Sequence, residues 1–291
     1  MSAPNTWNAV AVGIALVLAV AFADAGASAP DARPRRATGR IASGSIVADP
    51  LLLDLCAPER IAALSPRILE NPRYAERARP FATLSNPSAL EEVLTRAPDL
   101  LVVSHFANPQ VLARLRERGI AVLDLGPMHG AETLRSNIET IARLCDNAEG
   151  GRVLATRFTG RLRALSDAIT PGARPRGLYL AVYATKLFGG TRRTSYHDVL
   201  TGAGILDVAA ERYEGWPELS AEQVLALDPE LFVTKRGMAA VLCARSGLEL
   251  SRPCREGRIV EIEATLIDDP GLAIPDAAET LHAKVYGGAH R

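Results

Sequence analysis

The stretch "LEEVLTRAPDLLVV", Leu90 to Val103, recurs later in the chain as "AEQVLALDPELFVT", Ala221 to Thr234. Each copy has a short amphipathic segment with an early glutamate, then a proline, then a run of Leu, Val or Phe. This order predicts a helix, a turn and a buried strand. Solenoid repeats recur every 20 to 50 residues or so. A single repeat at this much longer distance instead predicts two similar lobes.

The composition is that of an ordinary globular protein. The chain has 291 residues, enough for two domains, with 48% hydrophobic and 23% charged residues. Its formal net charge is zero. A protein that binds nucleic acid or an anionic membrane surface is expected to carry a basic excess, so the sequence predicts neither partner.

The N-terminus resembles an export signal. An uncharged apolar run from Ala9 to Ala23 is followed by small residues at 25–27. A run of about 15 residues is short for a membrane span and suits the core of a signal peptide. We therefore predict a cleavable signal at 1–27, a leader at 28–39 and a periplasmic location. The lack of Lys or Arg before the run leaves a short membrane anchor as the alternative. Because no Cys follows the run directly, no lipid anchor is expected.

Export to an oxidising compartment makes the four cysteines candidates for disulfides. Cys243 and Cys254 flank a loop-like stretch and can close a short disulfide. Cys56 and Cys145 lie in apolar helical contexts, where they are either buried thiols or a second pair, and the sequence leaves both alternatives open.

Between residues 40 and 287, short apolar runs alternate with helical patterns. The predicted strands lie at 40–46, 60–64, 99–103, 120–125, 177–183, 205–209, 230–234 and 258–263. The predicted helices lie at 88–96, 109–119, 195–204, 220–229 and 274–287, and a polar loop is expected at 65–87. A long helical segment over 130–169 is expected to break near 146–151, with a second part of more than about 20 residues. Such alternation indicates α/β lobes with parallel sheets, at 40–130 and 171–291, joined by connecting helices at 131–170.

The motifs of the common enzyme classes are missing. The sequence contains no G-x-S-x-G nucleophile turn, no phosphate-binding G-x-x-x-x-G-K-[ST] and no dinucleotide-binding G-x-G-x-x-G. Asp268 and Asp269 adjoin Pro and Gly and are expected in a solvated turn. We therefore predict no catalytic residue, no metal ligand and no cofactor. The alternative is an exported metal-dependent enzyme that uses His105 and His129.

Polar and aromatic residues gather where predicted strands end. In parallel α/β lobes, ligands bind at the carboxyl ends of strands. The candidate ligand-binding residues at these positions are Ser65, Arg67, Ser104, His105, Tyr183, Phe188 and Trp216. Aromatic side chains beside an arginine suit a bulky, partly apolar ligand with polar or anionic edges.

The repeated segments, together with "RIAALSP", "LRERGIAVLDLGP" and "TSYHDVLTGAGILDVA", resemble the periplasmic binding proteins for vitamin B12, siderophores and haem. The resemblance covers roughly residues 40–286. It implies a class III fold of two Rossmann-like lobes joined by one long helix. Because a single rigid helix hinges less freely than several crossing strands, we expect only small lobe motions on ligand binding. It also implies a monomeric binding protein that captures an iron–siderophore, haem or corrinoid-like ligand for an ABC importer. A binding protein of the same fold with another hydrophobic cargo is a further alternative.

The resemblance gives particular residues a role. Glu91 and Glu222 match the glutamates that the family presents, one on each lobe, to arginines of the permease, which acts with its ATPase. A carboxylate in the first turn of a helix also favours the helix dipole, so capping is the alternative role. Trp216 matches an aromatic residue of the family's cleft. The vitamin B12 branch has an aromatic residue where this chain has Ser104, and it lacks His105. A second-lobe cysteine of another branch is replaced by Ala203.

Overall fold

The two copies of the repeat form the same structure. In the computed structural model, which describes residues 39–104, 108–169 and 174–287, α3 (Leu90–Arg96) precedes β3 (Leu100–Val103), and α8 (Ala221–Leu227) precedes β8 (Leu231–Lys235). Both helices end at a left-handed residue, Ala97 with φ 45° and Asp228 with φ 46°. The backbone turn that leads each helix into its strand is therefore the same in both copies.

The repeat also fixes how each strand joins its sheet. The carboxylate of Asp99 accepts a hydrogen bond from the Arg40 amide at 2.7 Å, and the carboxylate of Glu230 accepts one from the Arg176 amide at 3.0 Å. In return, the amides of Asp99 and Glu230 donate to the carbonyls of Arg40 and Arg176, at 2.8 and 2.7 Å. An acidic residue just before the strand thus pairs with the neighbouring strand in both lobes.

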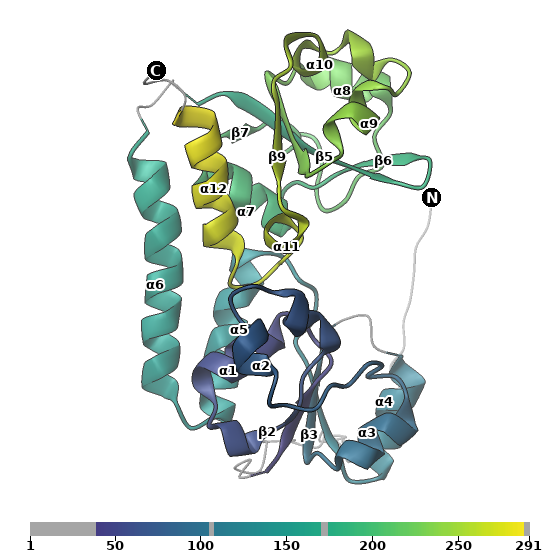
Figure 1. Ribbon diagram of the computed structural model, residues 1–291, viewed down its shortest axis with the longest axis vertical. Coiled ribbons are helices and arrows are strands. Elements are labelled where there is room, and N and C mark those ends of the chain that lie inside the picture. The colour runs from purple at the N-terminus through teal and green to yellow at the C-terminus, as the bar shows by residue number, and fades with distance from the viewer. Residues whose placement is uncertain (1–38, 105–107, 170–173, 288–291) are drawn as a thin grey trace, which may run out of the picture. The chain divides into compact units, whose positions relative to one another are not determined.

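The N-terminal sheet has four parallel strands in the order β2-β1-β3-β4. The other three strands are β1 (Ile41–Ser43), β2 (Ile61–Ala63) and β4 (Ala121–Asp124). Helices α3 and α4 (Pro109–Glu117) cover one face, and α1 (Ala48–Leu55) and α5 (Ala131–Leu144) cover the other (Figure 1). This arrangement confirms the predicted parallel α/β lobe.

The C-terminal sheet has the order β6-β5-β8-β9, and β7 also pairs with β5. Its remaining strands are β5 (Arg176–Tyr183), β6 (Lys186–Gly189), β7 (Leu206–Asp207) and β9 (Ile259–Ile262). Strand β6 pairs antiparallel with β5 and is absent from the predicted elements, because the Gly-Gly pair at its end resembles a loop. The other pairings are parallel.

Further helices flank the C-terminal sheet. Helices α7 (Ser195–Gly202) and α12 (Ile274–Tyr286) pack between this sheet and α6 (Ala148–Asp167), as Figure 1 shows. The short helices are α8, α9 (Ala239–Cys243), η3 (Leu248–Leu250), α10 (Arg252–Glu256) and α11 (Ala264–Ile267).

The connecting segment consists of two helices. Helix α5 ends at Leu144, and α6 begins at Ala148, after Asp146 with a left-handed φ of 55°. The predicted break is present, but it precedes the two glycines, which lie inside α6. Gly151 fits there because a side chain would collide with Ala142 of α5. Helix α6 has 20 residues, slightly fewer than predicted, which corresponds to about 30 Å.

The sequence pattern did not predict α1. Its residues Leu51, Leu52 and Leu53 are consecutive and all buried, so they show no helical period, and Pro50 lies in the first turn. The predicted polar loop at 65–87 contains two short helices, η2 (Pro66–Glu70) and α2 (Ala75–Ala78). Both are too short for a periodic signal.

One hydrophobic core is continuous between the two sheets. It includes Ile41 and Leu51 near the first sheet, Ile138 of α5, and Tyr179 and Leu281 of the C-terminal half, all at most 1% exposed. At the same junction, the Ala131 amide of α5 donates to Oδ2 of Asp198 in α7 at 2.6 Å. The first turn of α5 is thus capped by a side chain from the second half of the chain.

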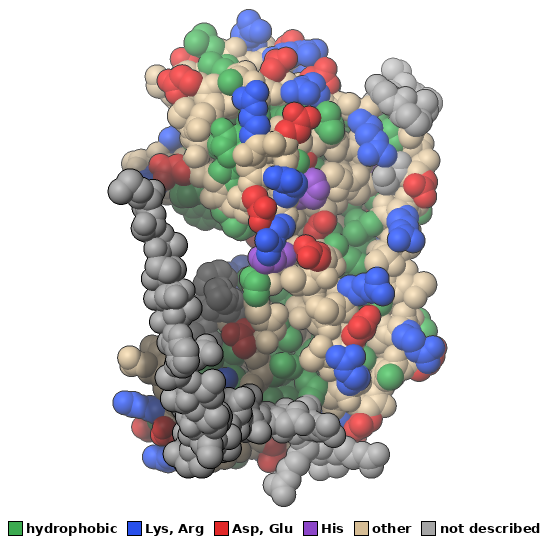
Figure 2. All heavy atoms as spheres, turned by 180° about the vertical axis from the view of Figure 1, so that it is seen from behind, with side chains coloured by type: hydrophobic (Ala, Val, Ile, Leu, Met, Phe, Trp, Pro, Cys, Tyr) green, Lys and Arg blue, Asp and Glu red, His purple; other side chains and the backbone are tan. Residues whose placement is uncertain are grey.

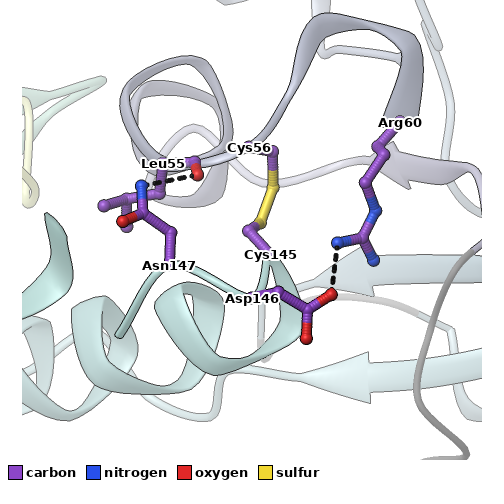
Figure 3. The surroundings of a disulfide bond; sticks show 6 residues. All are labelled: Leu55, Cys56, Arg60, Cys145, Asp146 and Asn147. Atoms are coloured by element: carbon purple, nitrogen blue, oxygen red, sulfur yellow. Dashed lines mark hydrogen bonds and ion pairs between the residues drawn. A yellow bond between two sulfur atoms is a disulfide. The ribbon is translucent and has the colours of Figure 1, made fainter. Parts of the chain in front are cut away.

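All four cysteines form disulfides. Cys56, at the end of α1, is bonded to Cys145, at the end of α5, with Cα atoms 4.8 Å apart (Figure 3). Asn147 donates to the Leu55 carbonyl at 3.0 Å beside this bond. Cys243 is bonded to Cys254, with Cα atoms 5.5 Å apart. The alternative of buried free thiols at Cys56 and Cys145 is therefore wrong, because α1, which the sequence pattern did not predict, brings them together.

Candidate functional site

A cavity of about 410 Å³ lies between loops that follow strands of the two sheets. Its walls come from the loop after β1, the segment between β4 and α5, the loops after β6 and β7, and the loop after α11. The lining residues are Ile46, Pro127, Met128, His129, Arg193, Thr194, Ser195, Tyr196, Glu214, Gly215, Trp216, Asp268 and Pro270. Its volume is within the range of small-molecule sites, about 300–1,000 Å³.

Aromatic rings form one wall of the cavity. The Trp216 side chain is 47% exposed, and its ring contacts Tyr196 edge-on with centroids 4.6 Å apart. Tyr196 in turn stacks on the fully buried Tyr179 at 3.8 Å. Gly215, with φ 69°, makes the turn that presents Trp216, and its amide donates to the Arg192 carbonyl at 2.8 Å. The indole is thus an apolar surface supported by a fixed aromatic base.

A polar network adjoins this wall. The Tyr196 hydroxyl donates to Oδ1 of Asp268 at 2.8 Å, and Nζ of Lys235 is 3.2 Å from Oδ2 of the same carboxylate. Lys235 also lies 4.8 Å from the centroid of the Tyr183 ring. Burial, followed by the neighbouring Tyr179 and Asp268, raises the pKa of Tyr196 far above its usual range. Tyr196 therefore acts as a hydroxyl donor and not as a phenolate.

Charged side chains bridge the rim of the cavity. Nη2 of Arg193 is 2.9 Å from Nδ1 of His129, and Nη1 of Arg193 is 3.0 Å from Oε1 of Glu214. A guanidinium only donates hydrogen bonds, so Nδ1 of His129 is the acceptor. This contact occupies one of the two imidazole nitrogens of His129.

The predicted ligand-binding residues are only partly brought together. Trp216 lines the cavity, and Arg67 lines a smaller adjoining cleft of about 50 Å³ that shares Ile46 and Asp268 with it. Ser104 contacts the Ser45 hydroxyl at 2.5 Å. His105 lies outside the described residues.

Three other candidates are not among the described residues that line the cavity. Ser65 is buried, and its hydroxyl donates to Asp49. Tyr183 and Phe188 contact each other edge-on at 5.9 Å, on the hairpin of β5 and β6.

Several residues of the cavity leave no signal in the sequence. Arg193 follows β6, which was not predicted, so no strand end marked its loop, and Tyr196 lies in α7, whose helical pattern does not indicate a place in the cavity. The expected turn at Asp268 and Asp269 is present, but both residues are half-buried rather than solvated. Asp268 accepts from Tyr196, and burial raises the pKa of Asp269 to about 6. A Pro-Gly pair predicts a turn but not its burial.

The two predicted docking glutamates are exposed in the first turns of α3 and α8. In α8 the helix cap is a capping box of Ser220 and Gln223, although a hydrogen bond with Ser220 also lowers the pKa of Glu222. In α3, Glu92 accepts from the amides of Ser85 and Asn86, at 2.7 and 3.0 Å. In α8 the capping box thus leaves Glu222 exposed, whereas in α3 the N-cap residue Ala89 offers no side-chain cap, Glu92 holds the preceding loop, and Glu91 is exposed.

In the part of the chain that the structure describes, three or more His, Cys, Asp or Glu side chains nowhere gather in a way that could hold a metal ion. No helix among these residues has the length and apolar character needed to cross a membrane. On the face seen in Figure 2, Lys and Arg side chains are interspersed with Asp and Glu, in keeping with the net charge of zero.

The architecture matches solved periplasmic proteins. The periplasmic heme-binding protein HutB of Vibrio cholerae superimposes with a TM-score of 0.74 and 22% identity, covering 85% of this chain and 98% of that one. The apo periplasmic heme-binding protein RhuT from Roseiflexus sp. RS-1 gives a TM-score of 0.72 and 21% identity, covering 86% and 99%. These likenesses confirm the predicted fold of two α/β lobes joined by a long helix.

The sequence comparisons agree. The vitamin B12-binding protein of Photorhabdus laumondii is 27% identical over 171 residues, 58% of this chain. The match spans 62% of that relative, less than two thirds of its length. The profile described as "Periplasmic binding protein" matches residues 77–266, well over half of the chain. This family is one of binding proteins, which agrees with the expectation that the chain is not an enzyme. With both repeat copies inside the matched region, the chain belongs to the periplasmic binding protein family.

Proposed function

We propose that this protein is the periplasmic solute-binding component of an ABC importer. It captures a bulky ligand of the iron–siderophore, haem or corrinoid class in the cavity between the sheets and delivers it to the permease. The observation that carries the proposal is Trp216, a half-exposed indole on a fixed aromatic base in a cavity of about 410 Å³. An exposed indole at such a position has a large apolar face available to a ligand.

The ligand class rests on two kinds of support. The relative from Photorhabdus laumondii is named for vitamin B12, and the structural neighbours are named for heme. The cavity combines an aromatic wall with charged groups at its rim, which suits a large conjugated or chelating molecule with polar edges. A metal in such a ligand is cargo, so the protein needs no cofactor of its own.

Delivery to the permease rests on Glu91 and Glu222. Both are exposed, one on each lobe, and in α8 the capping box is made by Ser220 and Gln223 rather than by Glu222. Exposed ion pairs with permease arginines would each contribute little, but two at matching places on a pseudo-symmetric body set the docking orientation.

Binding is tested by titration of the full chain with haem, cyanocobalamin and a ferric siderophore. The sequence contains two tryptophans, Trp7 and Trp216. In a Trp7→Phe background, all indole fluorescence therefore reports on the cavity. We expect one of the three ligands to quench this fluorescence at a stoichiometry of one.

The role of Trp216 is tested in the wild-type background, by isothermal titration calorimetry. We expect Trp216→Ala to weaken binding by about 2 kcal/mol, or roughly thirtyfold, with the fold intact by circular dichroism. Leu250→Ala is the matched control, because Leu250 is an exposed apolar side chain, at 62% against 47% for Trp216, outside the described lining of the cavity. Unchanged affinity in Trp216→Ala would contradict the proposal. Mass spectrometry of molecules that co-purify from native periplasm would identify the ligand.

A further inference from the structure

Arg193 links the two halves of the molecule across the rim of the cavity. Its Nη2 donates to Nδ1 of His129, in the segment between β4 and α5, at 2.9 Å. Its Nη1 donates to Oε1 of Glu214, in the loop after β7, at 3.0 Å. All three residues line the cavity. The guanidinium therefore lies where a ligand enters, and one of its two partners is a neutral acceptor.

The backbone at Arg193 is unfavourable for a residue with a side chain. Its φ is 61°, in the left-handed region that glycine adopts freely and other residues rarely do. Glycine occurs just before this position, at 189 and 190, but not here. Strained residues of this kind cluster at ligand-binding sites, and this one lines the cavity.

We propose that Arg193 is the specificity-determining residue of the cavity and selects ligands that carry a carboxylate at this edge. The inference rests on the proposed function and narrows its ligand class. The ligand carboxylate takes the place of His129 on the guanidinium, while Glu214 keeps the other side of the fork in position.

Hydrogen-bond chemistry favours this exchange for an anion. A guanidinium presents five N–H groups in a planar fork that matches a carboxylate. A carboxylate accepts two parallel hydrogen bonds from the fork and adds attraction between opposite charges, whereas a neutral imidazole nitrogen accepts a single bond. A neutral amide or ester at the same edge offers no such advantage and would leave Arg193 with His129.

The exchange also changes how the two halves are held together. The His129–Arg193 contact joins them at the cavity rim, whereas the nearby hydrogen bond from Ala131 to Asp198 joins them beneath it. Carboxylate binding releases the first contact and leaves the second. Under this proposal, the ligand displaces the Arg193–His129 contact, and the Ala131–Asp198 hydrogen bond stays in place.

The test compares two ligands with one macrocycle, haem and haem dimethyl ester, against the full chain. We expect the wild type to bind the free acid more tightly. Arg193→Gln should lose ten- to a hundredfold in affinity for the acid and less than about twofold for the ester. Arg192→Gln is the matched control. Arg192 is the neighbouring exposed arginine, donates to the Tyr213 carbonyl at 3.4 Å, and is not among the described residues that line the cavity.

His129→Ala gives a change of the opposite sign. Removing the competing acceptor should tighten binding of the acid by about two- to tenfold, and the ester should be unaffected. An equal loss for both ligands in Arg193→Gln, or weaker acid binding in His129→Ala, would overturn the inference.

A cyanocobalamin titration separates this inference from the proposed function. The corrin edge of cyanocobalamin carries neutral amides. If the protein binds cyanocobalamin and shows no preference for haem over haem dimethyl ester, the inference is overturned and the proposed function stands. Failure to bind haem, cyanocobalamin or a ferric siderophore would overturn both.

Discussion

Cys56 and Cys145 are 89 residues apart in the sequence, and their disulfide joins the end of α1 to the end of α5. The second disulfide, between Cys243 and Cys254, closes a loop of only 11 residues. The two bonds therefore restrict the unfolded chain to different extents.

Removing the long-range disulfide should destabilise the protein more than removing the short one. In the chain-entropy description, the 89-residue closure contributes at most about 4–5 kcal/mol and the 11-residue closure about 3 kcal/mol. Denaturant unfolding of Cys56→Ala/Cys145→Ala and Cys243→Ala/Cys254→Ala measures both. Equal losses, or a larger loss from the second pair, would contradict this ordering.

Acid should stabilise the protein relative to mildly alkaline buffer. Burial raises the pKa of Asp49 to about 7 and those of Asp198 and Asp269 to about 6, from 3.8 in each case. At a pH between the ordinary pKa of 3.8 and these raised pKa values, the native state binds more protons than the unfolded state. The free energy of unfolding therefore decreases as pH rises through this range. We expect a higher melting temperature at pH 5 than at pH 8.

The variant Asp49→Asn isolates the largest of these contributions. Asp49 is fully buried, and an uncharged amide cannot ionise there, so the decrease in stability between pH 5 and pH 8 should become shallower. A pH profile as steep as that of the wild type would show that Asp49 does not titrate in this range.

Arg161 should contribute measurably to the packing of α6 on α12. Its Nη2 is 2.6 Å from Oδ1 of Asp276, and its Nε is 2.7 Å from Oε1 of Glu279. Arg161→Ala should lower the free energy of unfolding by about 1–2 kcal/mol, and Arg161→Lys should recover only part, because an ammonium lacks the planar fork. Arg163→Ala is the control. Arg163 is exposed on the same helix, without a recorded ion pair among the described residues, and its loss should cost less than about 0.5 kcal/mol.

Charge reversal at the two exposed glutamates should separate binding from transport. We expect Glu91→Arg/Glu222→Arg to reduce ligand uptake more than tenfold in cells that carry the cognate permease, because like charges then meet at the docking surface. Ligand affinity of the purified protein should stay within about twofold. Glu149→Arg, an exposed glutamate at the start of α6, should leave uptake unchanged. If affinity falls in the double variant, the glutamates serve the fold instead.

The sequence predicted what depends on periodicity and missed what depends on burial. The repeat identified α3, β3, α8 and β8, since a helix, a proline turn and an apolar strand each leave a local pattern. Helix α1 was missed because its consecutive leucines are all buried, so no polar face interrupts them. Missing α1 then left the partner of Cys145 undetermined.

The cavity was harder to predict than the fold. Trp216 was identified because a tryptophan in a Glu-Gly-Trp-Pro turn is poorly placed for a core and because it matches an aromatic residue of the family's cleft. Tyr196 and Asp268 depend on a contact between residues 72 positions apart, which one sequence does not encode as a local pattern. Arg193 follows an unpredicted strand, and its contacts come from two other loops.

The cap that Asp198 provides to α5 bears on the order of events during synthesis. The acceptor for the Ala131 amide lies 67 residues further along the chain, in a helix of the other half. A ribosome releases the N-terminal half first, so α5 emerges with its first turn open and acquires its acceptor only when α7 has been made. The two lobes contain the same repeated unit, yet the first turn of α5, which packs on the N-terminal sheet, is capped only once Asp198 of the C-terminal half is in place.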